Sequence, residues 1–312
     1  MNQPLPLVSI GMPVYNGAPF LREALDALCA QEYPNFEVVI SDNASEDETD
    51  AICRAYAARD LRIRYYRNEK NYGAAWNFNR VFELSRGEFF MWAACDDLWR
   101  PSFIRKCAAL LRAHPEASLC HVQSQEMSPE GRPFGEPYHG LVNTDPDPRA
   151  RWHRVLSDLH WHIAVYGMMR ASCMRRTALM RNVWGSDQLF VAEMALYGAI
   201  VQVPECLWWH RRPEHISAHD AYRVVMQKLD PAHARPKRQW TQLGIHAQYA
   251  QIAMGCTLSI VTRLWLVWAV IINYFSSAAW ANDLQEIGMA MTPLQQETRI
   301  PEEAVQVAKD RP

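Results

Sequence analysis

The sequence lacks the features that mark several common protein classes. Its 32 basic and 34 acidic residues give a formal net charge of −2, so no excess of positive charge points to nucleic acid as a partner. Its eight cysteines are scattered without a CxxC pair, which disfavours a disulfide scaffold and favours a reduced, intracellular setting. Residues 1–6 are polar and proline-rich and precede a short apolar stretch, so we expect no signal peptide and a cytoplasmic location.

Two common nucleotide-binding motifs are also missing. No GxGxxG motif follows the first predicted strand, which argues against a nicotinamide-type dinucleotide domain, and no GxxxxGK[ST] motif occurs, which argues against a P-loop. A nucleotidyltransferase would need a glycine-rich, basic phosphate loop after that strand, and residues 13–17 do not provide one. A nucleotide site in this chain would therefore need other residues.

The N-terminal half alternates apolar strand patterns with helical patterns. Strands are predicted over residues 7–12, 36–41, 62–67 and 89–94, and helical patterns of about ten to fifteen residues lie between them. Either Ser45 or Asp47 can cap the second helix. This alternation is typical of an α/β fold with a parallel, helix-covered sheet. The length of 312 residues allows one large domain with an appendage, or two domains.

Polar residues follow three of these strands. The segment from Pro13 to Gly17 reads as a turn-rich loop after the first strand, Asp42 ends the second, and Asp96 and Asp97 follow the fourth. Ligands of open α/β sheets bind outside the carboxyl ends of the strands, so paired carboxylates there suit a divalent cation that carries a diphosphate. The alternative is a solvated Asp-Asp turn that caps the helix predicted from Pro101.

Four motifs in this half resemble glycosyltransferase family 2 in order and spacing. They are Pro13-Val-Tyr-Asn, Ser41-Asp-Asn-Ala-Ser-Glu-Asp-Glu-Thr, Asn71-Tyr-Gly-Ala-Ala-Trp-Asn and the pair Asp96-Asp97. The resemblance covers roughly residues 7 to 215. It implies a GT-A fold, which is a Rossmann-like mixed or parallel sheet flanked by helices. It also implies a nucleotide-sugar donor (UDP-, GDP- or dTDP-linked), Mg²⁺ or Mn²⁺ as cofactor, and inversion at the anomeric carbon.

The resemblance also implies roles for individual residues. Tyr15 would stack on the donor base, Asp42 would accept a hydrogen bond from its edge, Asp96 would hold the ribose or the sugar, and Asp97 would bind the metal. The family pattern usually has another acid just before this pair, where this chain has Cys95. The full set of expected donor-binding residues is Pro13, Val14, Tyr15, Asn16, Asp42, Asn43, Asn71, Gly73, Asn77, Asp96 and Arg212.

The middle of the chain is expected to serve the acceptor. A helix is predicted over 101–113, a strand over 117–125 and a helix over 151–159, whereas residues 126–150 are crowded with proline and glycine. A loop of this length is typically a lid or binding loop, so we expect a mobile flap over the active site rather than a passive insertion.

Asp187 precedes a helical run over 188–197 and matches the catalytic-base position of the resembling family. An inverting transfer is one displacement, so a carboxylate must take the proton from the acceptor hydroxyl. The alternative is that Asp187 or Ser186 only caps the helix.

Two segments, 201–204 and 207–217, complete the predicted core. The second contains two arginines and two histidines within six residues, which suits phosphate oxygens. His210, Arg212 and His215 could each contact the diphosphate, and the two histidines are weaker candidates for a further metal ligand because lone histidines are more often structural.

The C-terminal part is apolar and then polar. Residues 264–282 form a 19-residue uncharged run, about the length that crosses a bilayer, although Asn273, Ser276 and Ser277 disfavour a span. Three interpretations of this run stay open: helices that pack on the catalytic domain or form a dimer, a helix that lies on the inner face of the membrane, and a membrane-spanning helix. We expect a catalytic domain over 1–220, a helical region over 221–290 and a polar tail over 291–312. Within the first, the nucleotide-binding half is about 1–100, the acceptor half about 101–220 and the flap about 126–150.

The function expected from these patterns is sugar transfer. The leading hypothesis is an inverting, metal-dependent glycosyltransferase that uses a saccharide or lipid-linked acceptor in cell-surface polysaccharide or glycoconjugate synthesis. Cys95 and the unsettled third metal ligand suggest a donor-binding protein without turnover as an alternative. A nucleotidyltransferase is the third hypothesis.

Overall fold

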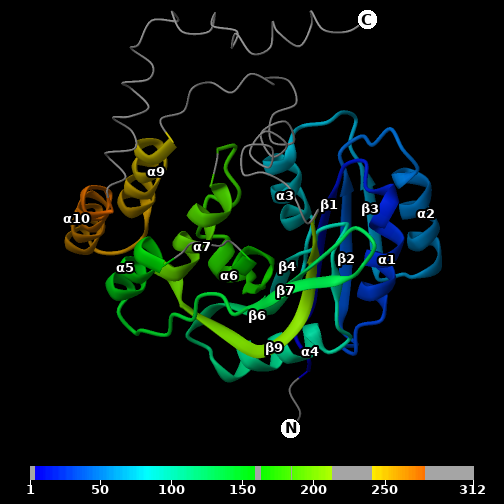
Figure 1. Ribbon diagram of the computed structural model, residues 1–312, viewed down its shortest axis with the longest axis horizontal. Coiled ribbons are helices and arrows are strands. Elements are labelled where there is room, and N and C mark those ends of the chain that lie inside the picture. The colour runs from blue at the N-terminus through cyan, green and yellow to red at the C-terminus, as the bar shows by residue number, and fades with distance from the viewer. Residues whose placement is uncertain (1–3, 159–162, 184, 213–240, 278–312) are drawn as a thin grey trace, which may run out of the picture.

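The computed structural model describes residues 4–158, 163–183, 185–212 and 241–277 (Figure 1). In chain order the elements are β1 (Val8–Val14), α1 (Ala18–Cys29), β2 (Phe36–Asp42), α2 (Thr49–Arg59), β3 (Ile63–Arg67), α3 (Ala74–Glu83), β4 (Phe89–Trp92), β5 (Leu98–Trp99), α4 (Phe103–Ala113), β6 (Ala117–Met127), β7 (Pro133–Tyr138), α5 (Pro148–Asp158), η1 (Ile163–Tyr166), β8 (Met168–Arg170), α6 (Ala171–Met174), α7 (Ser186–Tyr197), β9 (Ala199–Arg211), α9 (Thr241–Gly255) and α10 (Ile260–Ser276).

In the described part of the chain the strands form one mixed sheet in the order β3-β2-β1-β4-β8-β6-β9-β5, with β7 paired to β6. Strands β3, β2, β1 and β4 are parallel, and β8 is antiparallel to β4 and β6. The carboxyl ends of β1, β2 and β4 therefore lie at one edge of the sheet, where ligands of such sheets bind. The predicted α/β fold with a helix-flanked mixed sheet is confirmed.

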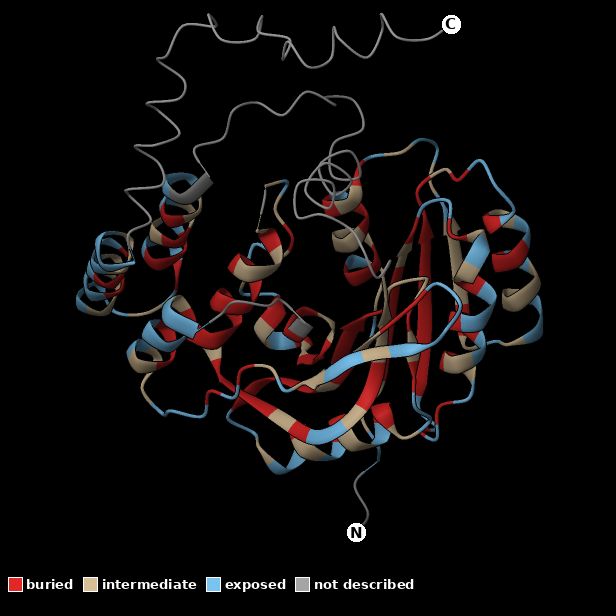
Figure 2. Cartoon of the chain, in the orientation of Figure 1, coloured by how far each residue is buried: buried red, intermediate tan, exposed pale blue. Residues whose placement is uncertain are grey.

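Both faces of the sheet are covered, which explains why its strands read as continuous apolar runs. All seven residues of β2 are buried, and Figure 2 shows the central strands in red beneath helices whose outer sides are exposed. Successive strand residues face opposite sides. Val38 and Ile40 therefore join a core cluster with α1, α2 and α4, whereas Val39 joins a second cluster with α3, α5 and α7.

Several predicted boundaries differ from the structure at the N-terminal edge. Strand β1 runs through Pro13 to Val14, and Pro13 is tolerated because it pairs only with Ser41 of β2, beyond the end of β4. Helix α2 begins at Thr49 with Glu48 at its N-cap, so neither predicted cap is the N-cap residue.

Proline and glycine misled the strand prediction in the middle of the chain. Part of the segment expected to be a loop over 126–150 is strand β7, which pairs antiparallel to β6. The expected core segment 201–204 and the beginning of the segment 207–217 belong to one strand, β9, and Pro204 falls where the register of β9 against β6 shifts. A proline is accommodated at such an irregularity because no ladder hydrogen bond is lost there.

Helices α9 and α10 share a core with α5 and α7. Trp152 of α5 is fully buried, lies edge-on to Tyr249 of α9 with ring centroids 5.8 Å apart, and donates from Nε1 to the carbonyl of Leu266 in α10 at 3.3 Å. Within the described ranges, no helix is long and apolar enough to cross a membrane. The domain boundary expected near residue 220 and the tail expected over 291–312 lie outside the described residues.

Candidate active site

The loops after β1, β2 and β4 meet at the carboxyl edge of the sheet. The backbone N–H of Asn43, just after β2, donates to the carbonyl of Val14 in β1 at 2.8 Å. A Cβ atom on Gly17 would lie 3.0 Å from the Cys95 Sγ, so the loop after β1 touches the residue before the Asp-Asp pair. Tyr15 is 44% exposed at this edge, as a stacking platform for a base would have to be.

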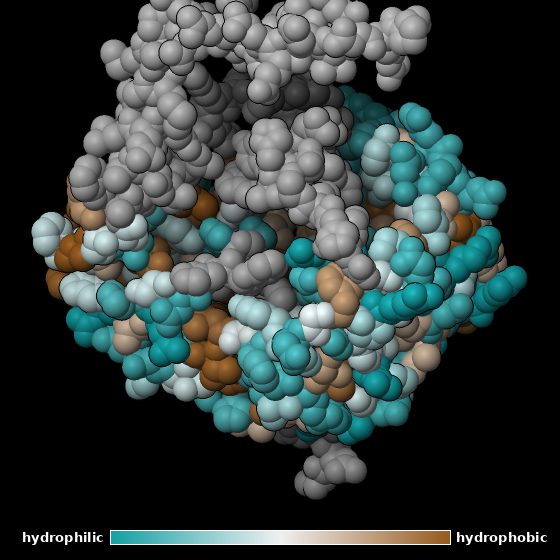
Figure 3. Space-filling model, in the orientation of Figure 1, coloured by the Kyte–Doolittle hydropathy of each residue, from teal (hydrophilic) through white to brown (hydrophobic). Residues whose placement is uncertain are grey.

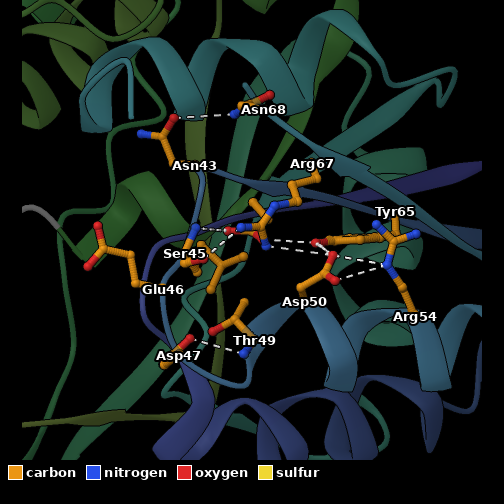
Figure 4. A network of polar contacts seen from close by, with 12 residues as sticks. Asn43, Ser45, Glu46, Asp47, Thr49, Asp50, Arg54, Tyr65, Arg67 and Asn68 are labelled. Carbon is orange, nitrogen blue, oxygen red and sulfur yellow. Dashed lines mark hydrogen bonds and ion pairs between the residues drawn. The ribbon is translucent and has the colours of Figure 1, made fainter. Parts of the chain in front are cut away.

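Asp42, the last residue of β2, is fully buried. It belongs to a polar network between β2, β3 and α2, of which Figure 4 labels Ser45, Tyr65 and Arg67. Its carboxylate accepts from the backbone N–H of Ser45 at 2.8 Å, the Tyr65 hydroxyl at 2.8 Å and Nη1 of Arg67 at 3.1 Å. Burial and the hydrogen bonds to Asp50 and Asp42 raise the pKa of Tyr65, which keeps the hydroxyl a donor. The network fixes the position of Asp42, while its contact with a donor base stays a prediction.

A set of asparagine contacts holds the loop before α3 against β2. Asn43 donates from Nδ2 to Oδ1 of Asn71 at 2.7 Å, and the same oxygen accepts from the N–H of Gly73 at 2.9 Å. Asn77 donates from Nδ2 to the Ser41 carbonyl at 2.8 Å. Gly73 has φ +88°, which favours glycine. These residues shape the predicted donor site, and their direct contact with a donor stays a prediction.

Asn16 supports the same edge from the loop after β1. Its Oδ1 accepts from the backbone N–H of Glu46 at 2.9 Å, and its own N–H donates to the Ser45 hydroxyl at 2.9 Å. Its φ of +52° is a conformation that asparagine tolerates better than most residues.

Asp97 is 4% exposed and is held by strand β9. Its Oδ2 accepts from Nε1 of Trp208 at 3.0 Å, and its Oδ1 accepts from the backbone N–H of Arg211 at 3.1 Å. Burial raises the pKa of Asp97 and the adjacent Asp96 raises it further, while the two hydrogen bonds lower it. A bound dication would offset the cost of keeping this carboxylate charged.

Arg211 is the residue that the sequence prediction missed. Its side chain is 3% exposed, and its Nε donates to the Asp96 carbonyl at 3.0 Å. Its Nη2 donates to Glu23 of α1 at 2.9 Å, its guanidinium lies 4.3 Å from the Phe20 ring centroid, and Nη1 donates to the carbonyls of residues 128 and 129. Strand alternation places Arg211 on the opposite face from residues 210 and 212, which spacing alone did not reveal.

The two neighbours of Arg211 point elsewhere. Arg212 donates from Nη1 to Oε1 of Glu126 at 2.7 Å, and Nε2 of His210 lies 3.8 Å from the same oxygen. Nδ1 of His210 and Nε of Arg212 are buried without a hydrogen-bond partner among the described residues. Burial lowers the pKa of His210, which favours the neutral imidazole that binds metals. His215 lies outside the described residues.

Asp187 lies in the first turn of α7 and accepts from the backbone N–H of Gln188 at 2.9 Å. Burial raises the pKa of Tyr166, and the charges of Asp97, Asp96 and Asp187 raise it further. The Tyr166 ring packs 5.3 Å from that of Trp208, which holds Asp97.

The donor set at this turn fits a divalent metal that binds together with a diphosphate. No group of three or more histidine, cysteine, aspartate or glutamate side chains within metal-binding reach occurs in the described ranges. Mg²⁺ needs no such cage, since it keeps several waters and takes one or two carboxylates plus substrate phosphates. Asp97 and Asp96 would provide the two carboxylates, and because burial raises the pKa of Asp97, a neighbouring cation would offset the cost of its negative charge.

Comparison with known families and proteins gives a consistent result. The model of the family "Glycosyl transferase family 2" matches residues 9–175, more than half of the chain. An uncharacterized glycosyltransferase from Rickettsia typhi is 39% identical over 99 residues, which are 32% of this chain and 30% of that protein. An uncharacterized protein from Mycobacterium tuberculosis (strain ATCC 25618 / H37Rv) is 31% identical over 216 residues, 67% of this chain and 59% of that protein. The chain therefore spans about a third to three fifths of these relatives.

Solved structures share the fold. TarS 1–349 of S. aureus in complex with UDP-GlcNAc superposes with a TM-score of 0.61 at 18% identity, covering 89% of this chain and 80% of that one. The mannosyltransferase PcManGT from Pyrobaculum calidifontis, in complex with GDP-Man and Mn²⁺, superposes with a TM-score of 0.52 at 19% identity. The match covers 91% of this chain and 80% of that one. At these identities the likeness establishes the fold alone.

Proposed function

Because the chain belongs to glycosyl transferase family 2, we propose that it is an inverting, metal-dependent glycosyltransferase. It moves a sugar from a nucleotide donor to a saccharide or lipid-linked acceptor, in the synthesis of cell-surface polysaccharide or glycoconjugate. The donors named with the similar structures, UDP-GlcNAc and GDP-Man, set the first donors to test.

One observation carries the proposal. Asp97 is buried beside Asp96, just after β4, and strand β9, from a distant part of the chain, holds its carboxylate through Trp208 and the backbone N–H of Arg211. The pair supplies two carboxylates for a metal with its diphosphate, and Asp187 in the first turn of α7 supplies a third for proton transfer. Tyr15 follows β1 and Asp42 ends the neighbouring strand β2. Both therefore lie at the carboxyl edge of the sheet, where we propose that the nucleoside binds.

The proposed reaction is one displacement. The acceptor oxygen bonds to the anomeric carbon while the bond from that carbon to the diphosphate oxygen breaks, and the nucleoside diphosphate leaves with the electron pair. Asp187 takes the acceptor proton, and the N-terminus of α7 favours negative charge at this position. When bound, Mg²⁺ or Mn²⁺ neutralises charge on the diphosphate. Trp208 and the Arg211 N–H orient Asp97 for that contact.

A donor screen with and without Mn²⁺ tests the proposal. We expect nucleoside diphosphate release from a UDP- or GDP-sugar that depends on the metal and stops when EDTA removes it. Donor binding without nucleoside diphosphate release, in every combination of donor and acceptor, would favour the donor-binding protein without turnover. Cys95, in place of the usual acid, would then explain the missing activity. Pyrophosphate release would favour the nucleotidyltransferase.

Replacing the proposed base should separate binding from transfer. We expect Asp187→Asn to lower the transfer rate by 10²-fold or more, because a positioned base contributes about that much, while the donor Kd stays within about twofold. Steady-state kinetics and calorimetric donor titration measure the two quantities. Asp158→Asn is the matched control, since Asp158 is 44% exposed in a surface pair with Arg154. Full transfer by Asp187→Asn would remove this residue from the mechanism.

A further inference from the structure

One side of helix α10 is entirely apolar and exposed. The side chains concerned recur every three or four residues along the helix, so they lie on one face. Figure 1 shows α10 at the left edge of the molecule, beyond α5 and α9, and Figure 3 shows hydrophobic atoms there. We call this the α10 outer face. It consists of Ile260 (56% exposed), Val261 (72%), Leu264 (58%), Trp265 (37%), Trp268 (59%), Ile271 (43%), Ile272 (47%) and Phe275 (60%).

The helix that carries this face is firmly attached to the protein. Its inner face buries Leu266, Ala269 and Val270 in the core shared with α5 and α7. Asn273 donates from Nδ2 to the Leu156 carbonyl at 3.3 Å, and its Oδ1 lies 3.1 Å from Nε2 of His246 in α9. The exposed apolar side chains are therefore held in place by a buried opposite face.

The size of the α10 outer face matches one side of a protein interface. A fully exposed large apolar side chain presents roughly 200 Å², so eight that are about half exposed present on the order of 800 Å². A typical monomer exposes contiguous apolar patches of only a few hundred Å². A standard interface buries about 800 Å² on each partner.

The charges around this face favour protein over lipid. A helix that lies on a membrane carries lysine and arginine on its polar side, whereas the single charge of α10 is Arg263. The Arg263 side chain donates to the carbonyls of Leu258 and Met254. At the rim, Arg149 lies 5.9 Å from the Trp265 ring centroid but is ion-paired with Asp147 at 2.8 Å. Both of these described arginines are thus engaged in contacts within the protein and offer little charge to anionic headgroups.

We propose that the α10 outer face binds the same face of a second copy of this chain and forms a two-fold symmetric dimer. A two-fold axis brings one surface patch against itself, so an uncharged apolar face meets its own complement without like-charge repulsion. Ridges of large side chains on two α10 helices can interdigitate as in other helix pairs.

Sedimentation velocity of the full chain between about 1 and 100 μM tests the dimer without donor, metal or acceptor. We expect a species of twice the 36.0 kDa chain mass, and a shift to the single chain mass in Trp268→Glu over the same range, a loss of at least 100-fold in affinity. Leu61→Glu is the matched control, since Leu61 is 98% exposed far from α10 and should leave the dimer intact. Val261→Glu serves as a second variant should Trp268→Glu fail to fold, as circular dichroism would reveal.

Three results would overturn the proposal. One is a wild-type chain that stays monomeric at 100 μM, and another is a dimer that survives both glutamate variants. The third is a monomeric chain that binds vesicles of phosphatidylglycerol and phosphatidylcholine through the α10 outer face, which would identify a lipid surface as the partner. These experiments measure association alone. The dimer proposal can therefore fail while sugar transfer is detected, or hold while no transfer is detected.

Discussion

Arg211 connects several separate parts of the proposed active site. Its side chain joins the Asp96 carbonyl to Glu23 and Phe20 of α1, and its N–H holds Asp97. It contacts none of the expected donor atoms in the proposed mechanism, so it is a positioning residue. The rigidity of the turn that bears the carboxylate pair depends on it.

We therefore expect Arg211→Lys to lower kcat by about 10- to 100-fold, the usual effect of losing a residue that orients a metal ligand. Lysine cannot reproduce the planar fork that reaches both the Asp96 carbonyl and Glu23. The readout that separates positioning from folding is the concentration of Mn²⁺ needed for half-maximal activity, which should rise while the melting temperature changes little. Arg105→Lys, in a surface pair with Glu32, should behave as wild type. An unchanged Mn²⁺ requirement would contradict the role given to Arg211.

The residues that the sequence predicts for the site and those that it does not single out differ in one physical respect. Asp42, Asp97 and Asp187 stand beside strand ends or helix starts, where chain-local patterns are informative. Arg211 and Tyr166 matter only through contacts of the folded chain, those of Arg211 with the Asp96 carbonyl and of the Tyr166 ring with Trp208, and no local spacing encodes such contacts.

Among the elements, α7 and α9 determine where Asp187 stands. The two helices meet at Gly185, where φ is +73° and an added Cβ would lie 2.5 Å from the Cδ1 of Ile245. Burial and the charge of Asp187 raise the pKa of Tyr249 in α9, so α9 lies within electrostatic reach of the proposed base. The position of the start of α7 thus depends on packing against α9, which comes about fifty residues later in the chain.

Gly185→Ala should consequently damage both stability and activity. The left-handed conformation costs an L-residue about 1–2 kcal/mol, and the new methyl group would push α9 away from α7. We expect a lower free energy of unfolding in urea and a loss of transfer with donor affinity retained. Gly244→Ala, one residue before Ile245 in α9, meets nothing within 4 Å and should be neutral or slightly stabilising. Equal behaviour of the two variants would refute the role of the α7–α9 contact.

Strands β1, β2 and β4 were predictable as apolar runs because nearly all of their residues are buried. Strands β5 and β8 were not predicted, since two or three residues carry no readable period. Strand β7 was hidden by its prolines and glycines, and its pairing with β6 is a non-local choice. Short or edge elements depend on their partners more than on their own residues.

For the molecule as a whole, stability should fall between neutral and mildly acidic pH. Burial lowers the pKa of His121, which is 3% exposed beneath the Leu141 carbonyl, so the folded state disfavours its protonated form. A group with a depressed folded pKa binds more protons in the unfolded chain. The contribution of neutral His121 to the free energy of unfolding is therefore complete above about pH 6.5. It is lost as the pH falls towards the pKa of His121 in the folded state.

Urea unfolding at pH 7, 6 and 5 measures this dependence. One such histidine changes the free energy of unfolding by at most about 1.4 kcal/mol per pH unit. His121→Gln should flatten the profile in part, because burial also lowers the pKa of His210. A profile that is equally steep with and without His121 would show that other groups dominate it.

The packing of α9 against the start of α7 has a consequence for synthesis on the ribosome. The strands whose ends are proposed to hold the nucleotide emerge first, but the helix that backs Gly185 is translated only after residue 241. A nascent chain can thus complete the strands of the proposed nucleotide site early, while the start of α7, which bears the proposed base, can be packed only after α9 has been translated.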